Sequence, residues 1–302
     1  MAKKGMSLLI PIYNEENSIE NLFDQLQEFL NDTTYVNEII IINDGSSDST
    51  LQMIHLCFQK IKINIKIINN PLNLGYGASL KRGILESVND YIAIIDADLT
   101  YDVYAVARLY EDTIKENLDM AVAARMGKYY EGNFGKKILR RILRTIVEYM
   151  TGQSIPDINS GLRIFKRNIA LRYLPLLSNH FSFTTSLTLV TMLQGGIVKY
   201  VPTSYQRRRG TTKVNLLKDS TRTLGQILAV SFFFNPLRVI YPFIFLLMFG
   251  LVATLVGVIL YAVSILILFG FVCLILVLLL LGFQSQMMSL GQQIKVGYEN
   301  NA

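Results

Sequence analysis

Short apolar segments alternate with amphipathic ones over the first 125 residues of the chain. The apolar segments are rich in β-branched residues, as in buried strands, whereas the stretches between them repeat apolar positions at helical spacing. The predicted strands are 6–12, 37–43, 65–70, 91–97 and 120–124, and the predicted helices are 17–30, 49–60, 78–87 and 103–116. This βαβ alternation predicts an α/β fold with a mostly parallel sheet and helices on both of its faces.

The last part of the chain contains a long apolar run. No Asp, Glu, Lys, Arg or His occurs between residues 239 and 294, and these about 56 residues would be roughly 84 Å long as a single helix. A bilayer core is roughly 30 Å thick, so two crossings fit. We place them at 237–258 and 264–283, with a tight turn at 260–264. The alternative is a helical hairpin buried in a soluble core, but such helices usually keep a polar face.

Basic residues flank the predicted hairpin and set its orientation. They are Arg207, Arg208, Arg209, Lys213, Lys218, Arg222 and Arg238 before it and Lys295 after it. The positive-inside rule therefore places the large domain and both termini in the cytoplasm. The apolar run at 6–12 is too short for a secretory signal. The expected organisation is a cytoplasmic domain at 1–214, a juxtamembrane amphipathic helix at 215–236, two spans within 237–283 and a cytoplasmic tail at 284–302.

Polar clusters follow four of the predicted strands. The first strand leads into PIYNEE, the second into NDGSSD, the third into residues 69–77 and the fourth into Asp96-Ala97-Asp98. The carboxyl ends of parallel strands meet at one edge of a sheet, where α/β proteins bind their ligands. Each cluster alone also fits a turn or a helix cap. Their shared location favours a binding site.

Asp96 and Asp98 are the candidate metal ligands. Mg²⁺ typically takes one or two carboxylates together with phosphate oxygens and water, so this pair could hold a divalent cation that carries a diphosphate. The two cysteines and two histidines are isolated in the sequence. They indicate neither a disulfide framework nor a zinc site, and we interpret both histidines as structural.

Six motifs in a fixed order give the chain a recognisable resemblance. They are PIYNEENSI, INDGSSDST, NLGYGASLKRG, IIDADLTY, DINSGLRIF and RRRGTTK, followed by the paired spans. In this order they resemble the family 2 glycosyltransferases, specifically the polyprenyl-phosphate group that includes dolichol-phosphate mannose synthase and bacterial undecaprenyl-phosphate glucose transferases. The resemblance covers essentially the whole chain and implies a Rossmann-like glycosyltransferase A-type domain.

The resemblance also implies roles for individual residues. Pro11, Tyr13, Glu15 and Asp44 would hold the nucleotide base and ribose, Asp96 and Asp98 the donor diphosphate through Mg²⁺ or Mn²⁺, and Arg125 would lie near the phosphates. The segment with Arg207, Gly210, Thr212 and Lys213 resembles the family's mobile basic loop. Two features depart from the family: Asp102-Val103 stands where prolines are common, and Thr212 replaces the commoner serine.

Asp157, in DINSGLR, matches the family's proposed catalytic base. The second pKa of a phosphate monoester is about 6, so the expected acceptor is mostly a dianion at pH 7 and gains little from a base. We therefore predict that Asp157 positions a substrate through hydrogen bonds.

A second basic segment occupies about 135–152. Ile138, Leu139, Ile142, Leu143, Ile146 and Val147 recur on one helical face, and Lys136, Lys137, Arg140, Arg141 and Arg144 lie beside them. This pattern is typical of a helix in the membrane interface. A core-facing helix with a solvated basic rim is the alternative. We expect the interface because of the charge, and Arg140 is among the candidate ligands of a lipid-linked phosphate.

The expected function is the inverting transfer of a hexose from a nucleotide sugar to a polyprenyl phosphate, at the cytoplasmic face of the plasma membrane of a prokaryote. UDP-glucose is the expected donor, and the alternatives are a GDP-mannose-dependent mannose synthase or a transferase with another lipid or polysaccharide acceptor. A processive polysaccharide synthase would carry a Trp-containing motif, and the chain has no Trp. A nucleotidyltransferase would not need the hairpin, and a degenerate scaffold would not need intact carboxylates. We expect no nucleic-acid partner, and a homo-oligomer stays an open alternative.

Overall fold

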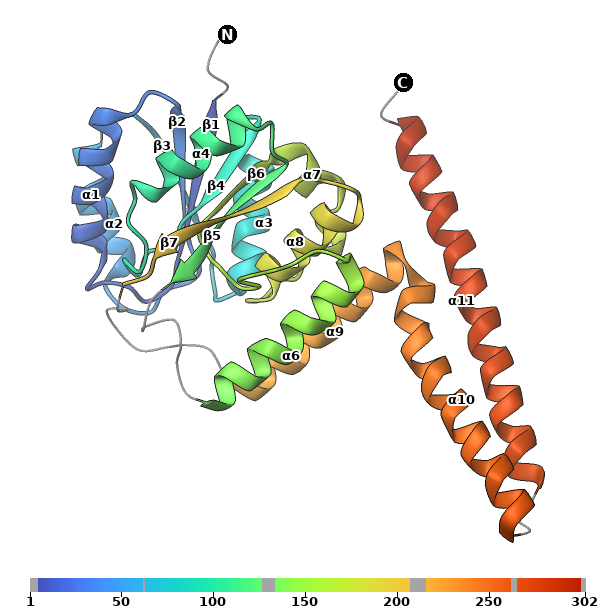
Figure 1. The fold of residues 1–302 in the computed structure, drawn as a ribbon. Helices are drawn as coiled ribbons and strands as arrows, with labels where there is room; N and C mark the ends of the chain where they lie inside the picture. The colour runs from blue at the N-terminus through green and yellow to red at the C-terminus, as the bar shows by residue number, and fades with distance from the viewer. Residues whose placement is uncertain (1–4, 62, 127–133, 207–215, 262–264, 300–302) are drawn as a thin grey trace. The chain divides into compact units, whose positions relative to one another are not determined.

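The computed structural model describes residues 5–61, 63–126, 134–206, 216–261 and 265–299 (Figure 1). The chain forms two compact units, Met1–Gln226 and Ile227–Ala302. The segment 207–215, which contains the predicted basic loop, lies outside the described residues. So do residues 262–264 of the predicted turn between the spans.

The first unit is built on a seven-stranded sheet of order β3-β2-β1-β4-β6-β5-β7. Its strands are β1 (Met6–Ile12), β2 (Val36–Asn43), β3 (Asn64–Asn69), β4 (Tyr91–Ile94), β5 (Met120–Met126), β6 (Arg163–Lys166) and β7 (Val198–Ser204). All neighbours pair in parallel except β6, which runs antiparallel to both β4 and β5. The predicted mostly parallel sheet is confirmed, and each of the five predicted strands is present.

Helices cover both faces of this sheet (Figure 1). The helices of this part of the chain are α1 (Ile19–Asp32), α2 (Thr50–Cys57), α3 (Tyr76–Glu86), α4 (Ala105–Lys115), α6 (Phe134–Thr151), α7 (Arg167–Arg172) and α8 (Phe183–Leu193), with short 3-10 turns at Phe58–Lys60 and Leu174–Leu176. Side chains alternate between the two faces of the sheet along each strand. Leu8 therefore packs on one face, in a core that includes residues of α1 and α4. Leu9 faces the opposite side, where Gly83 lets α3 approach it closely.

The helix α6 matches the predicted 135–152 segment, but its apolar positions divide between two faces. Leu143, Val147 and Met150 are buried in the first unit. Ile138, Ile142 and Tyr149 are 45%, 50% and 44% exposed. They recur four, then seven residues apart, so they form a second stripe along the helix. The apolar face that the sequence predicts is therefore divided lengthwise: one stripe packs in the core and the other is exposed.

The second unit contains two long apolar helices. The helix α9 (Leu216–Phe234) runs from the first unit into the second, and α10 (Pro236–Tyr261) and α11 (Ile265–Glu299) follow it. Gly250 of α10 lies close to Phe271 of α11, so the two helices pack against each other. Residues 284–299, predicted as a tail, belong to α11.

Both helices are long and apolar enough to cross a membrane. The candidate spans are Pro236–Gly257 and Phe269–Met288, with mean hydropathies of 2.5 and 2.2 and only 11% and 6% of their residues buried within the protein. A helix that is apolar all round and exposed needs an apolar surrounding. The predicted pair of apolar helices is confirmed, with the second shifted by a few residues from 264–283.

Candidate active site

The loops that follow β1, β2 and β3 form one continuous surface at the carboxyl edge of the sheet. The backbone N–H of Asn14 donates to Ser46 Oγ at 3.0 Å, and the N–H of Glu15 donates to Thr50 Oγ1 at 2.8 Å. Asn14 and Gly45 hold positive φ angles of 50° and 66°, as tight turns require. Tyr13 and Glu15 are half-buried on this surface, whereas Pro11 is buried within β1.

Asp44 organises the loop after β3. It is buried, and its carboxylate accepts hydrogen bonds from Asn70 Nδ2 at 2.8 Å and from the backbone N–H groups of Leu74 and Gly75, both at 2.9 Å. A carboxylate has about four acceptor positions, so the predicted contact with a nucleotide base would use the remaining one. The sequence did not indicate this structural role.

Asp96 and Asp98 follow β4 in a tight turn. Asp98 is 7% exposed, and its Oδ1 accepts hydrogen bonds from Thr100 Oγ1 at 2.6 Å and from Thr100 N at 3.2 Å. Leu99, which directly follows Asp98, holds φ 58°, a left-handed conformation that costs a residue other than glycine roughly 1–2 kcal/mol. Such local strain is typical of functional sites. Asp96 Oδ1 accepts a hydrogen bond from the Tyr76 hydroxyl at 3.0 Å.

The oxygen atoms at this turn suit a cation that takes only part of its coordination from the protein and the rest from a bound phosphate compound and water. No group of three or more His, Cys, Asp and Glu side chains converges anywhere in the part of the chain that the structure describes. The side chains of Asp96 and Asp98 therefore supply two carboxylates at most. A hard divalent cation with two protein carboxylates completes its octahedron with phosphate oxygens and water.

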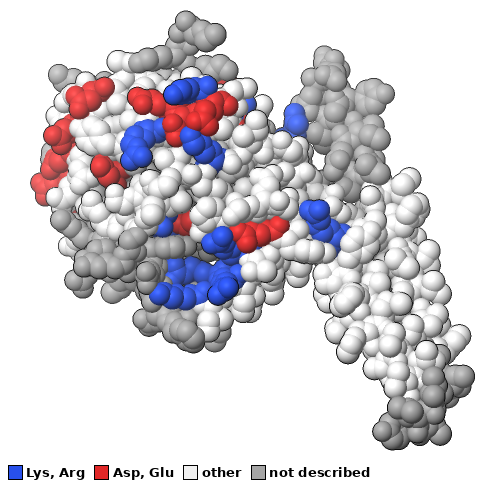
Figure 2. Space-filling view, viewed as in Figure 1, with Lys and Arg blue, Asp and Glu red and all other residues white. Residues whose placement is uncertain are grey.

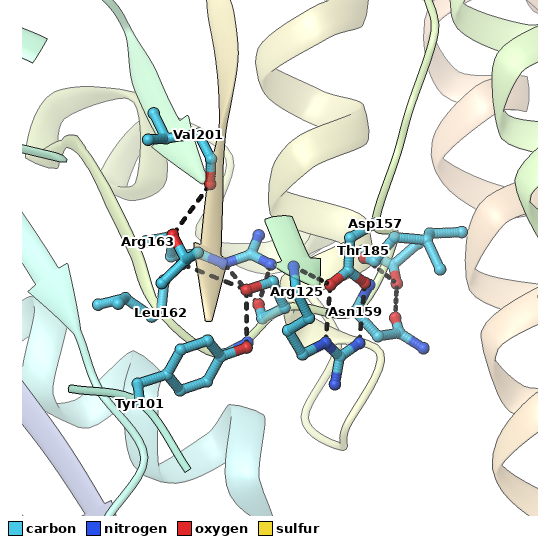
Figure 3. Close-up of polar contacts among 12 residues, drawn as sticks. Tyr101, Arg125, Asp157, Asn159, Leu162, Arg163, Thr185 and Val201 are labelled. Atoms are coloured by element: carbon cyan, nitrogen blue, oxygen red, sulfur yellow. Dashed lines mark hydrogen bonds and ion pairs between the residues drawn. The ribbon is translucent and has the colours of Figure 1, made fainter. Parts of the chain in front are cut away.

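Asp157, which is buried, forms an ion pair with the partly buried Arg125 (Figure 3). Arg125 Nε donates to Asp157 Oδ2 at 2.7 Å and Arg125 Nη2 donates to Oδ1 at 2.8 Å, a fork-shaped contact. The backbone N–H groups of Arg125 and Asn159 also donate to this carboxylate, each at 3.2 Å. The sequence identified both residues but assigned Arg125 to the donor phosphates. In the structure its guanidinium binds Asp157 and lies 5.4 Å from the ring centroid of Tyr205.

The environment keeps Asp157 ionised. Burial by itself raises the pKa of this carboxyl, but the hydrogen bonds and positive charge of Arg125 outweigh it, and the pKa lies below the ordinary value of 3.8. A general base must hold a proton between steps, and a strongly paired carboxylate is poorly suited to that.

The loop that carries Asp157 is fixed from several sides (Figure 3). Tyr101, three residues after Asp98, lies with its hydroxyl 2.9 Å from Ser160 Oγ. Arg163 is fully buried and donates to the Ser160 and Thr184 carbonyls and, at 3.0 Å, to Thr188 Oγ1. The sequence motifs do not indicate these contacts, although Arg163 stands in DINSGLR.

The remaining predicted residues lie around this centre or outside the described residues. Arg140 lies on α6 and is half-buried. Arg207, Thr212 and Lys213 lie in the segment that the structure does not describe. Gln206, immediately before that segment, donates its backbone N–H to the Thr100 carbonyl at 2.9 Å. The chain therefore enters the predicted basic loop next to the turn that carries Asp98.

Comparison with known proteins identifies the family. Residues 7–174, more than half of the chain, match Glycosyl transferase family 2. The protein therefore belongs to this family, as the six motifs predicted.

Three curated relatives show which members of the family the chain resembles. A dodecaprenyl-phosphate galacturonate synthase of Rhizobium johnstonii is 24% identical over 76% of this chain and 67% of its own length. A dolichyl-phosphate beta-glucosyltransferase of Dictyostelium discoideum is 31% identical over 57% of each chain. An undecaprenyl-phosphate 4-deoxy-4-formamido-L-arabinose transferase of Yersinia pestis is 26% identical over 61% and 58%. The resemblance to the polyprenyl-phosphate group is confirmed, and the chain spans about half to two thirds of the length of the curated relatives it matches.

Solved structures share the fold. Glucosyl-3-phosphoglycerate synthase from Mycobacterium tuberculosis, in complex with uridine diphosphate, superposes with a TM-score of 0.62 and 19% identity over 76% of this chain and 81% of that chain. The same enzyme in complex with Mn²⁺, uridine diphosphate and phosphoglyceric acid gives a TM-score of 0.62 and 17% identity over 76% and 79%. The predicted glycosyltransferase A-type domain is confirmed.

Proposed function

We propose that this protein is a membrane-anchored transferase that moves a hexose from a nucleotide sugar to the phosphate of a polyprenyl phosphate. One observation carries the proposal: the turn with Asp96 and Asp98 and the loop with Asp157 are in direct contact. Tyr101 joins the two through Ser160, and Gly161 lies directly against the Asp96 carboxylate. Donor and acceptor groups bound to these two segments would therefore meet.

The donor side would hold a nucleoside diphosphate. The surface that includes Tyr13, Glu15 and Asp44 would take the base and ribose, as the family resemblance implies. Asp96 and Asp98 would hold Mg²⁺ or Mn²⁺, which neutralises charge on the diphosphate as it leaves. The related solved structure with Mn²⁺ and uridine diphosphate supports a divalent cation in this fold, and the segment with Arg207, Thr212 and Lys213 would add cationic groups over the phosphates.

The acceptor side would lie between Asp157 and the basic helix α6. Glu148 near the end of α6 accepts a hydrogen bond from the backbone N–H of Ile155 at 2.9 Å, so the helix is joined directly to the loop that carries Asp157. Exposed Lys and Arg side chains gather over α6 (Figure 2). Arg140 and Arg141 of this helix would attract the acceptor phosphate. The names of the three polyprenyl-phosphate relatives support this acceptor class.

The membrane association follows from exposed apolar surface. The helices α10 and α11 would span the bilayer as a hairpin, with the catalytic domain and both termini on the cytoplasmic side. The exposed stripe of Ile138, Ile142 and Tyr149, flanked by basic side chains, would place α6 in the membrane interface. An acceptor that is itself a membrane lipid would then reach the site without leaving the bilayer.

The chemistry would be one inverting displacement. An oxygen of the acceptor phosphate forms a bond to the anomeric carbon as the bond from that carbon to the donor diphosphate breaks, and the electron pair leaves with the nucleoside diphosphate. Asp157 would stay ionised and keep Arg125 and its own loop in place, so that the acceptor approaches from the side opposite the leaving group. No proton has to be removed from a phosphate dianion.

UDP-glucose is the donor that we propose, and GDP-mannose is the alternative, because a carboxylate such as Asp44 can accept hydrogen bonds from either base. A screen decides between them. The purified protein is incubated with UDP- and GDP-linked sugars and with undecaprenyl or dolichyl phosphate, and the lipid products are identified by mass. We expect a hexosyl-phosphate lipid from UDP-glucose. A product from GDP-mannose alone would replace the donor assignment, and the absence of any glycosylated lipid phosphate with every donor would contradict the acceptor class.

A further inference from the structure

Tyr76 makes a direct contact with the candidate metal site that the predicted roles do not include. It is the first residue of α3, and its hydroxyl donates to Asp96 Oδ1 at 3.0 Å. An ionised carboxylate can only accept a hydrogen bond, so the Tyr76 phenol is the donor in this contact.

The ring of Tyr76 is held in place by a second segment. Phe181 stacks on it with ring centroids 5.7 Å apart and an interplanar angle of 21°. The backbones around the two rings are in contact, since Ala78 N–H donates to the Asn179 carbonyl at 3.0 Å and a side chain at Gly77 would collide with the Ser178 carbonyl. Stacked aromatic pairs of this kind are stabilising beyond the area that they bury. The phenol therefore has little freedom to move away from Asp96.

The other side of the Asp96 carboxylate is closed by Gly161. A side-chain carbon built at this glycine would collide with the carboxylate of Asp96, chiefly with Oδ2. Asp96 is therefore confined between the phenol of Tyr76 and the backbone of the loop that carries Asp157. Two segments more than 80 residues apart in sequence fix one carboxylate.

We propose that Tyr76 is a positioning residue that fixes the orientation of Asp96 and so sets the affinity of the site for a divalent cation. The hydrogen bond to Oδ1 fixes the rotation of the carboxylate, and Phe181 fixes the phenol. Groups that orient a metal ligand typically contribute about 10- to 100-fold to metal affinity or activity. This inference rests on the proposed function, in which Asp96 holds the cation of the donor complex.

The test compares Mn²⁺ binding by full-length wild type and Tyr76→Phe, which removes one hydroxyl and keeps the ring. Free Mn²⁺ is measured by electron paramagnetic resonance during titration in the presence of UDP. We expect the dissociation constant for Mn²⁺ to rise about tenfold in Tyr76→Phe, and to rise by a smaller factor in Phe181→Leu, which keeps the hydroxyl but removes the stacked ring.

Tyr104→Phe is the matched control, because the Tyr104 hydroxyl donates to Asp32 Oδ2 at 3.1 Å on the surface. We expect it to bind Mn²⁺ as wild type does. A purely structural role of Tyr76 would also weaken UDP binding measured by calorimetry in EDTA, whereas the positioning role leaves that metal-free binding unchanged.

The outcomes separate this inference from the proposed function. Unchanged Mn²⁺ affinity in Tyr76→Phe, or equal losses with and without metal, would overturn the role of Tyr76 and leave the transferase assignment intact. Failure of the wild type itself to bind Mn²⁺ with either UDP or GDP would overturn both.

Discussion

The Asp157 carboxylate accepts hydrogen bonds from the guanidinium and backbone N–H of Arg125 and from the backbone N–H of Asn159. Because its pKa lies below the ordinary value, the pair stabilises the fold at neutral pH. That contribution disappears only as the pH falls through the lowered pKa. Between pH 5.5 and 8 the carboxylate therefore stays ionised. This agrees with a positioning role and gives it a measurable consequence.

Asp157→Asn should lower the transfer rate by a factor that is constant from pH 5.5 to 8. We expect a loss of about a hundredfold, the size that a misplaced reacting group can cause. Initial rates at saturating metal give the measurement, with wild type assayed in parallel. Asp119→Asn serves as the control, since Asp119 pairs with Lys166 away from this loop. A deficit that closes by about tenfold as the pH rises would identify Asp157 as a general base, because the acceptor dianion no longer needs one at high pH.

Asp98→Asn should reduce transfer by at least about a hundredfold, equivalent to about 2.7 kcal/mol of activation free energy. The substitution keeps the size of the side chain but removes the charge that would hold the cation. Asp102→Asn is the matched control, because Asp102 is exposed in the same turn and caps Tyr104 N–H at 3.0 Å. Near-normal transfer by Asp98→Asn, or by the wild type in excess EDTA, would contradict the metal assignment.

At the residue scale the sequence identified the acids but not their partners. Asp98 and Asp157 stand in short motifs that can be found by inspection. The pairing of Asp157 with Arg125 joins positions 32 residues apart, and Tyr76 meets Asp96 across 20 residues. Such contacts depend on which strands are neighbours in the sheet, and residue spacing contains no information about that.

At the scale of elements, α6 presents two apolar stripes with different surroundings. Leu143 and Val147 pack inside the first unit, whereas Ile138 and Ile142 are exposed. Basic side chains gather over the same helix (Figure 2). An exposed apolar stripe on a basic helix gains free energy in contact with an anionic lipid surface.

The lipid contact can be measured with a fluorophore at Ile142. Cys57→Ser and Cys273→Ser first remove the two native thiols, and Ile142→Cys is then labelled with an environment-sensitive dye in reconstituted liposomes. We expect blue-shifted emission and quenching by spin-labelled lipid. Ile114→Cys on α4, where the isoleucine is 41% exposed, should show neither effect. Equal quenching at both positions, or at neither, would contradict the interfacial assignment of α6.

The helices and strands that could not be predicted from the sequence lack a clear hydrophobic periodicity. Every residue of α8 from Phe183 to Met192 is buried, so its apolar positions do not recur at helical spacing. The strand β6 has only four residues, RIFK, and lies between β4 and β5. The strands β1 to β5 were recognised because they are longer or strongly apolar and alternate with amphipathic helices.

At the scale of the whole molecule, the hairpin of α10 and α11 predicts the location of both termini. Tags at Met1 and Ala302 should both be accessible from the cytoplasmic side in a protease-protection assay, since two spans return the chain to the side where it started. Intact right-side-out cells provide the control for the opposite side. Tags on different sides of the membrane would require an odd number of spans and would contradict the hairpin of α10 and α11.

The central claim is that the oxygen of a polyprenyl phosphate is the nucleophile in a single displacement. The direct measurement uses wild type, an α-linked UDP-hexose and undecaprenyl phosphate labelled with ¹⁸O in its phosphate. Mass and NMR of the lipid product report the label and the anomeric configuration. We predict one phosphate that retains all of the ¹⁸O and a β-linked hexose. A lipid diphosphate, which would mean transfer of a sugar phosphate, or retained α-configuration would contradict the account.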